Sequence, residues 1–274
     1  LEFLQGGENQ LQLAKAAVES GNPTMSSEDV ELISPVPNPP SVRDAYAFRQ
    51  HVATARRNRG LEMIPEFDEI PIFYFTNHHA VFGEGDFSVL SRHTEKLDFE
   101  LECAAIIGKS GRNISAIDAD DYIAGFMIMN DLSARVLQMQ EMKLNLGPAK
   151  GKDFGSTFGP WLVTKDELEP YKQSSKDGDR YDLKMKAFVN DIQVSGDTLS
   201  NMTWTFAQII ERVSYGVDIF PGDVIGSGTC GTGCFLELNG SKITDNQWLN
   251  PGDTVSLEID GLGTLTNKIV LEQG

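Results

Sequence analysis

Two largely apolar runs that carry or precede carboxylates constrain the fold of this chain most. The run 99–107 contains Glu100 and Glu102, and the run 122–129 is followed one residue later by Asp131. Apolar runs of this length are typical of strands in a sheet that is buried on both faces. Because side chains alternate along a strand, Glu100 and Glu102 should point to the same face. Two carboxylates on one face indicate a bound cation, although a solvent-facing strand edge would show the same alternation.

The segment after the second run is rich in helix formers. Residues 132–143 predict a helix, on which Asp131, Arg135 and Gln138 would share one face at spacings of four and three residues. An Arg and a Gln beside a carboxylate that binds metal would suit an oxyacid substrate, because Arg bonds carboxylates in a bidentate way. Asp131 as a helix cap, with an exposed Asp–Arg pair, is the simpler alternative.

Ligation by oxygen atoms alone favours Mg²⁺, Mn²⁺ or Ca²⁺ over Zn²⁺. None of the four His residues stands at a zinc-motif spacing from a second His or Cys. We therefore predict a divalent metal cofactor, with Mg²⁺ as the first choice.

Three motifs together resemble the fumarylacetoacetate hydrolase family. They are Asp-Phe-Glu-Leu-Glu at 98–102, Met-Asn-Asp-Leu-Ser-Ala-Arg at 129–135 and Gly-Pro-Ala-Lys-Gly-Lys-Asp-Phe at 147–154. The resemblance runs from about Pro35 to the C-terminus. It implies that Glu100, Glu102 and Asp131 hold the metal and that the family's lysine corresponds to Lys152. Without the resemblance, a lysine in a Gly-rich loop would be taken for a solvated one.

The segment 41–58 predicts one helix, with a capping-box pattern at Ser41 and Asp44 and a stop at Gly60. On such a helix Asp44 and His51 would share a face, about 10 Å apart along the axis. The sequence Asp-Ala-Tyr-Ala-Phe-Arg-Gln-His at 44–51 also resembles the family, and specifically its hydrolase branch. It implies a further metal ligand at Asp44, a substrate contact at Tyr46 and a general base at His51.

The resemblance implies three more site residues: substrate-binding Tyr74 and Thr229, and Glu237, which would orient His51. Tyr74 as a core aromatic and Glu237 on the polar face of a strand are the alternatives from the residues alone. The arginines that follow the helix at 56, 57 and 59 form a basic cluster, and one of them is a candidate to steer an anionic substrate.

Composition limits the partners and the compartment. A net charge of −17 argues against nucleic acid, and a small anionic oxo acid would need a local basic patch. No apolar run approaches the roughly 18 residues of a membrane span, and there is no signal-peptide pattern. An odd number of Cys residues, three, suggests reduced thiols, so we expect a cytoplasmic protein without a membrane partner.

The chain divides into an N-terminal segment with a Pro-rich linker, 1–40, and a catalytic domain, 41–274. The sequence begins at Leu1, and the segment 1–40 resembles the remnant of a small N-terminal domain. Residues 9–20 predict a short helix ending before Gly21. The candidate buried positions on this helix are Leu11, Leu13, Ala16 and Val18.

The remaining chain predicts many short strands, with a hairpin at 190–191, an amphipathic helix at 203–214 and strands from 245 to 270. The fold class is therefore mixed α/β and mainly β. The resemblance implies the family's mixed β-roll, in a homodimer.

The resemblance implies metal-dependent hydrolysis of a carbon–carbon bond in a β-diketo acid of the fumarylacetoacetate or acylpyruvate type, within aromatic or tyrosine catabolism. His51 would activate water, while Arg135, Gln138 and Lys152 would stabilise oxyanion charge. One alternative is decarboxylation, isomerisation or hydration of a small 2-oxo acid through a metal-bound enolate. A second is a non-catalytic metal- or ligand-binding module.

Overall fold

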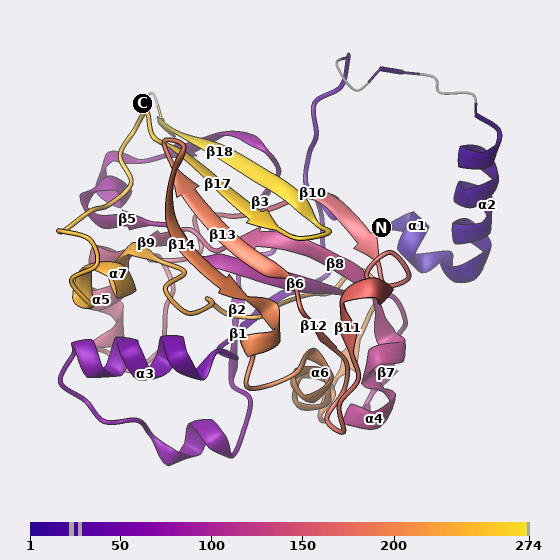
Figure 1. Cartoon of the computed structure of the whole chain (residues 1–274), viewed down its shortest axis with the longest axis horizontal. Coiled ribbons are helices and arrows are strands. Elements are labelled where there is room, and N and C mark those ends of the chain that lie inside the picture. Colours follow the sequence, from indigo (N-terminus) through magenta and orange to yellow (C-terminus); the bar gives the residue numbers. More distant parts are fainter. Residues whose placement is uncertain (22–24, 27–28, 273–274) are drawn as a thin grey trace.

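Two β-sheets form the body of the protein in a computed structural model (Figure 1). The structure describes residues 1–274 apart from 22–24, 27–28 and 273–274. The larger sheet has seven strands in the order β2-β1-β16-β6-β8-β10-β3. Their bounds are β1 Val42–Ala45, β2 Phe73–Thr76, β3 Val81–Phe82, β6 Leu101–Ile107, β8 Ile123–Asn130, β10 Ser156–Thr164 and β16 Val224–Gly226.

The two apolar runs of the sequence form neighbouring strands of this sheet. β6 pairs antiparallel with β8, and every residue of β6 is buried. Cys103 and Ala105 pack into one core cluster, whereas Ala104 and Ile106 pack into another. Alternate residues of a strand face opposite sides, so both faces of the sheet are covered at β6. The prediction of a sheet buried on both faces is confirmed here.

The smaller sheet has five strands in the order β14-β13-β17-β18-β4. Their bounds are β4 Gly85–Val89, β13 Lys184–Val189, β14 Ile192–Thr198, β17 Thr254–Ile259 and β18 Gly263–Leu271. Asn190 and Asp191 both have positive φ, at 51° and 65°, and join β13 to β14 in the predicted hairpin. Met185 and Leu257 of this sheet share a core cluster with Phe126 of β8, so the two sheets enclose one core.

Helices and short strands complete the chain. The helices are α1 Glu2–Gln5, α2 Gly7–Glu19, α3 Arg49–Asn58, α4 Ala116–Ala119, α5 Arg135–Met142, α6 Phe206–Ser214 and α7 Phe235–Gly240. The remaining strands, each of two residues, are β5 Leu97–Asp98, β7 Gly111–Arg112, β9 Ser133–Ala134, β11 Lys172–Gln173, β12 Arg180–Tyr181 and β15 Asp218–Ile219. The prediction of a mixed α/β, mainly β fold is confirmed.

The predicted helix 41–58 is wrong in its first half. Residues 42–45 form β1, which pairs parallel with β16 and antiparallel with β2. The hydroxyl of Ser41 donates to Asp223 at 2.6 Å instead of capping a helix. Long-range pairing on both sides satisfies the backbone of β1, and this overrides the local capping pattern. The helix begins at Arg49, so Asp44 and His51 belong to different elements.

Two further local predictions are corrected. The helix predicted from residue 132 begins at Arg135, because residues 133–134 pair with β5 as β9. Asp131 therefore precedes the helix and is neither its cap nor on its face. Glu237 lies on the short helix α7 rather than on a strand.

The N-terminal helix exists, but it does not bury the positions that its sequence suggested. Leu13 and Val18 of α2 are 63% and 81% exposed, Ala16 is exposed and Leu11 is half-buried. Figure 1 shows the reason: α2 projects from the side of the molecule next to α1, away from the two sheets. Leu4 of α1, by contrast, packs under the large sheet.

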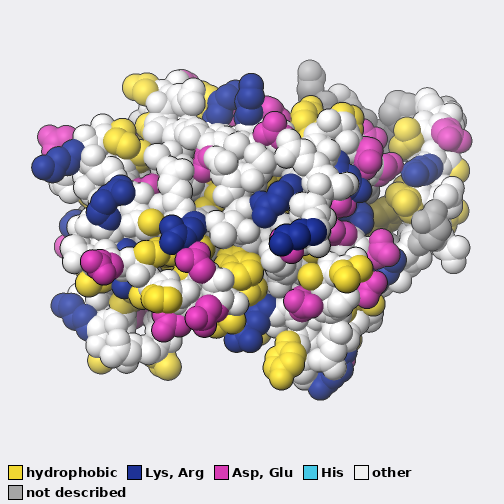
Figure 2. Space-filling model, turned by 60° about the horizontal axis from the view of Figure 1, so that its bottom comes forward, with side chains coloured by type: hydrophobic (Ala, Val, Ile, Leu, Met, Phe, Trp, Pro, Cys, Tyr) yellow, Lys and Arg dark blue, Asp and Glu magenta, His cyan; other side chains and the backbone are white. Residues whose placement is uncertain are grey.

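The surface carries both signs of charge. Figure 2 shows a face on which Lys and Arg side chains alternate with Asp and Glu, so the net negative charge is not gathered into one patch there. Among the described residues, no helix combines the length and the apolar character needed to cross a bilayer.

Candidate active site

Four buried carboxylates from separate parts of the chain meet at one end of the large sheet. Asp44, Glu100, Glu102 and Asp131 each offer one oxygen, and these oxygens all lie within 4.8 Å of one another. Asp44 comes from β1, Glu102 from β6 with Glu100 just before it, and Asp131 directly follows β8. The structure thus brings together all four residues that the sequence proposed as metal ligands.

The backbone around this acidic cluster explains why the side chains converge. The β6 and β8 strands pair with Glu102 opposite Met129, which places Asp131 next to the two glutamates. The amide of Asn130 accepts the backbone N–H of Glu100 at 3.0 Å and fixes that residue beside the end of β8. A Cβ on Gly226 would lie 2.4 Å from Oδ1 of Asp44, so this glycine makes room for the carboxylate.

Two buried cations lie beside the acidic cluster. Lys152 Nζ contacts Glu100 Oε2 at 2.5 Å and Asp131 Oδ2 at 2.7 Å. The guanidinium of Arg135 contacts Glu100 Oε1 at 2.8 Å. The phenol of Tyr74 donates to Asp131 Oδ2 at 2.5 Å. Lys152 is therefore a buried ion-paired residue, not a solvated loop lysine.

The charges in this cluster are incompletely balanced. Burial, with the neighbouring charge of Asp131, raises the pKa of Asp44 to about 8. Burial also raises the pKa of Glu102 well above its usual range, and Asp44 adds to the shift. Burial alone would raise the pKa of Glu100 as well, but Lys152 and Arg135 outweigh it and hold that pKa at about 2. The Asp44–Glu102 side of the cluster therefore lacks positive charge.

One oxygen of the cluster shows where a cation would fit. Glu102 Oε2 is buried and has no hydrogen-bond partner among the described residues, while Glu102 Oε1 accepts from Thr229 at 3.2 Å. A buried carboxylate oxygen without a partner is costly unless a cation neutralises it. Four carboxylates are also the hard oxygen donors that Mg²⁺ and Mn²⁺ prefer. The residues present therefore fit a divalent cation.

A histidine and a glutamate form a second functional unit. His51 Nδ1 lies 2.6 Å from Glu237 Oε2, and both side chains are buried. An ionised carboxylate can only accept, so Nδ1 is the donor in this contact, and Nε2 is the ring nitrogen that remains for proton exchange with a substrate. His51 comes from the first turn of α3 and Glu237 from α7, and these helices pack against each other.

The other predicted residues surround these two units. The Tyr46 ring packs edge-on against the His51 ring with centroids 5.7 Å apart, and burial raises the pKa of Tyr46 to about 12. Gln138 accepts from Arg135 Nη1 at 3.0 Å, so it orients the guanidinium.

The three arginines of the basic cluster bond locally within the described chain. The partners are the Glu62 carbonyl for Arg56, Thr54 for Arg57 and the Ala55 carbonyl for Arg59. Arg59 still influences the site, because its charge lowers the raised pKa of Tyr46.

Asp98 is a site residue that the sequence analysis did not select. Its carboxylate is completely buried and contacts Arg135, with Nε and Nη2 both 2.8 Å from Oδ2. It also accepts the backbone N–H groups of Phe235 and Leu236, at 2.7 and 3.0 Å. The sequence signal that could have identified Asp98 was its position inside the motif 98–102, between the apolar residues Leu97 and Phe99.

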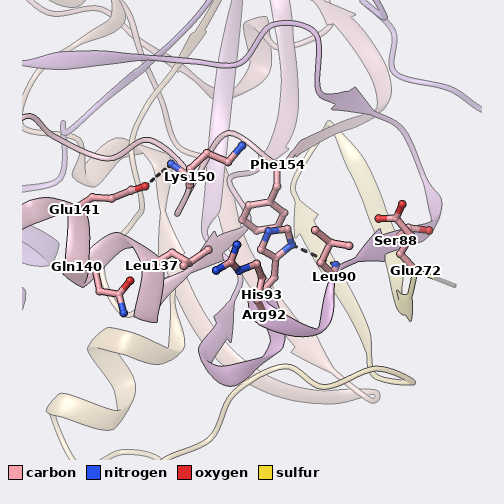
Figure 3. A pocket seen from close by; sticks show the side chains of 10 residues that line it. All are labelled: Ser88, Leu90, Arg92, His93, Leu137, Gln140, Glu141, Lys150, Phe154 and Glu272. Atoms are coloured by element: carbon pink, nitrogen blue, oxygen red, sulfur yellow. Dashed lines mark hydrogen bonds between the residues drawn. The ribbon is translucent and has the colours of Figure 1, made fainter. Parts of the chain in front are cut away.

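A separate pocket of about 460 Å³ lies beside α5, and its lining residues do not include the acidic cluster (Figure 3). Glu141 lines it and accepts the backbone N–H groups of residues 149, 150 and 151, at 2.9, 2.6 and 3.1 Å. These bonds anchor the loop that carries Lys152. The His93 ring stacks on Phe154 in the same pocket, with centroids 4.3 Å apart.

Comparisons with known proteins identify relatives of this chain. A family model described as "Fumarylacetoacetate (FAA) hydrolase C-terminal" matches residues 41–270. The mitochondrial oxaloacetate tautomerase FAHD2A of Homo sapiens is 31% identical over 270 residues, 98% of this chain and 79% of that protein. The oxaloacetate tautomerase YisK of Bacillus subtilis (strain 168) is 32% identical over 256 residues, 92% of this chain and 77% of that protein.

The fold of this chain is also found in solved structures. The 5-carboxymethyl-2-hydroxymuconate delta-isomerase from Mycobacterium smegmatis matches with a TM-score of 0.68 at 26% identity, over 90% of this chain and 83% of that one. The match confirms the expected β-roll fold. With a family model that covers most of its length, the chain belongs to the fumarylacetoacetate hydrolase family.

Proposed function

We propose that this enzyme uses a divalent metal to interconvert the enol and keto forms of a small 2-oxo acid such as oxaloacetate. The observation that supports this most is the buried cluster of four carboxylates. One of its oxygens has no hydrogen-bond partner in the described part of the chain, and the side chains of Lys152 and Arg135 lie on one side of it. Relatives named as oxaloacetate tautomerases and a structure named as a delta-isomerase favour the same class of reaction. Tautomerisation or isomerisation therefore replaces carbon–carbon hydrolysis as the first choice.

Asp44, Glu100, Glu102 and Asp131 would hold the cation, with Mg²⁺ or Mn²⁺ as the expected ions. When bound, the cation supplies Lewis-acid polarisation of the substrate oxygens. A 2-oxo acid brings a carboxylate of its own, so positive charge must be close to the acidic cluster. Lys152 and Arg135 supply that charge at its edge, and Thr229 offers a hydroxyl from the other side.

The His51–Glu237 pair would move the proton. With Nδ1–H donated to Glu237, His51 Nε2 can accept a proton from the substrate carbon and return it to the oxygen, or the reverse. The Glu237 carboxylate stabilises the imidazolium that forms in between. Neither step needs water, so the buried position of both side chains is compatible with the reaction.

The direct test follows the enol absorbance of oxaloacetate with Mg²⁺, with Mn²⁺ and with excess EDTA, while pyruvate release is measured separately. We expect faster loss of the enol form without pyruvate release, abolished by EDTA and strongly reduced in His51→Ala. If the metal-loaded protein leaves the rate of tautomerisation the same as in the metal solution without protein, the proposal is wrong. Pyruvate release would point instead to decarboxylation.

Hydrolysis of a carbon–carbon bond remains the second candidate, because a short His51–Glu237 contact is also suited to activating water. The same protein preparation should be assayed on fumarylacetoacetate, fumarylpyruvate and acetylpyruvate. Cleavage of one of these acids without tautomerisation of oxaloacetate would make the chain a hydrolase. Tight metal binding with no turnover on any of the acids would indicate a binding module.

We also propose the homodimer that the resemblance implies. Light scattering coupled to size exclusion would test it, since a monomer mass would contradict the proposal.

A further inference from the structure

The buried carboxylate of Asp98 joins the two functional units of the site. On one side, this carboxylate contacts Nε and Nη2 of Arg135. On the other side, it accepts hydrogen bonds from the first two backbone N–H groups of α7. Arg135 borders the acidic cluster, and α7 carries Glu237, the partner of His51. One carboxylate therefore contacts both the side chain that would face the substrate charge and the helix that holds the proton-transfer pair.

We propose that Asp98 is a positioning residue, which keeps Arg135 and the His51–Glu237 pair in one fixed arrangement without touching substrate. The inference rests on the proposed function for its kinetic consequence. Asp98 belongs neither to the predicted metal ligands nor to the proton-transfer pair.

The geometry of the carboxylate explains why other residues would not serve. Oδ2 accepts from Arg135 and from the Leu236 N–H, and Oδ1 accepts from the Phe235 N–H. Both oxygens must therefore be acceptors. An Asn in this position would turn an NH₂ group toward donors on one side, so at least one of the two connections would be lost.

Arg135 has few other means of holding its position. Its Nη1 donates to Gln138, and its Nη2 also contacts Glu100. Nε has Asp98 as its acceptor. With this bond gone, rotation about the guanidinium axis is less restricted, and a misplacement of about 1 Å at such a group can cost about 10²-fold in rate.

The test compares Asp98→Asn with the matched control Asp223→Asn. Asp223 is also a buried aspartate that accepts a backbone N–H, from Phe220 at 2.8 Å, and contacts an arginine, Arg43 at 3.6 Å. It lies just before β16, outside the helices α3 and α7 that carry His51 and Glu237. Asp223→Asn should lower the free energy of unfolding about as much as Asp98→Asn does, and it should leave kcat unchanged.

For Asp98→Asn we expect kcat on enol oxaloacetate to fall by about 10- to 100-fold, the range found when residues that orient a functional group are changed. Mn²⁺ affinity should change little, because Asp98 bonds to Arg135 and α7 and not to the predicted metal ligands. KM should rise less than kcat falls, because the fixed geometry matters most in the transition state. Equal kinetic losses in Asp98→Asn and Asp223→Asn would overturn the proposal, since they would reflect general destabilisation.

A second readout does not depend on turnover. The His51 Nδ1 proton in its short bond to Glu237 should give a low-field proton NMR signal, assigned by its loss in His51→Gln. This signal should shift or disappear in Asp98→Asn and remain in Asp223→Asn. If wild-type protein proves inactive on every acid, the proposed function fails, yet the NMR result still decides the role of Asp98.

A variant of Arg135 covers the case in which Asp98→Asn does not fold. Arg135→Lys keeps the positive charge but removes the Nε bond to Asp98. Because the connection to His51 runs through Asp98 and α7, the low-field signal should shift in this variant as well. An unchanged signal in Arg135→Lys would contradict the proposed connection.

Discussion

The stability of the metal-free protein should fall as pH rises from weakly acidic to weakly basic values. The pKa of Asp44 is raised from 3.8 to about 8 by burial and by the charge of Asp131. The folded state therefore binds this proton more tightly than the unfolded chain does. Stability from the bound proton is present at low pH and is lost as pH rises between these two pKa values.

The expected change in the free energy of unfolding follows from the loss of one proton from Asp44. Each pH unit inside this window costs up to about 1.4 kcal/mol of unfolding free energy per group. Between about pH 6 and pH 8 the loss from Asp44 should be about 2 kcal/mol. The pKa of Glu102 is raised for the same reasons, so this residue acts in the same direction.

The assay is urea unfolding at a series of pH values, first in EDTA and then with Mn²⁺. In EDTA the free energy of unfolding should decrease across the window. The added ion should restore it most at the higher pH, because metal binding requires the deprotonated carboxylates. Asp44→Asn serves as the control, since it removes one of the two titrating groups and should weaken the pH dependence measured in EDTA. If the stability of the metal-free protein rises or stays constant from about pH 6 to about pH 8, Asp44 does not bind its proton more tightly in the folded state than in the unfolded chain.

Three other substitutions test separate parts of the account. Glu237→Gln should lower kcat by about 10²-fold while Mn²⁺ affinity is retained, as measured by turnover and calorimetry. Lys152→Met should cost about 3–5 kcal/mol in urea unfolding, because two buried carboxylates lose their cation, whereas the exposed Lys184→Met should be neutral. Phe126→Ala should cost about 3–5 kcal/mol, since this ring packs in the core against Tyr181 at 5.0 Å.

The strands that form the site could be predicted because their signal is local. The runs around β6 and β8 are apolar enough to require burial on both faces, and the carboxylates at their ends follow from the strand period. The hairpin at 190–191 was equally readable, since Asn and Asp tolerate the positive φ that both positions adopt.

The elements that were predicted wrongly depend on pairing partners that are far away in the sequence. Residues 42–45 carry a helix-start pattern, but their backbone bonds go to β16 and β2. That pairing carries Asp44 into the acidic cluster, which a helix spanning Asp44 and His51 would not have done. Similarly, Ser133 is in a strand because β5 lies opposite. Local patterns cannot report such pairings.

Asp98 and the exposed apolar residues of α2 show two other features that the sequence alone could not predict. A buried aspartate between apolar neighbours becomes meaningful only when Arg135 and the start of α7 lie around it, 37 and 137 residues away. The apolar residues of α2 were candidates for burial, yet Leu13 and Val18 are exposed. An apolar residue type favours burial but does not identify what would cover it.

Calorimetric titration of the metal-free protein with Mn²⁺ measures whether the four carboxylates bind a common ion. If the four carboxylates share one divalent cation, wild-type protein should bind one ion per chain, with proton release that grows as pH falls below about 8. Glu102→Gln should bind far more weakly, because it neutralises the carboxylate whose Oε2 has no partner among the described residues. Wild-type binding that is absent, or that is equally tight in Glu102→Gln, would contradict the account.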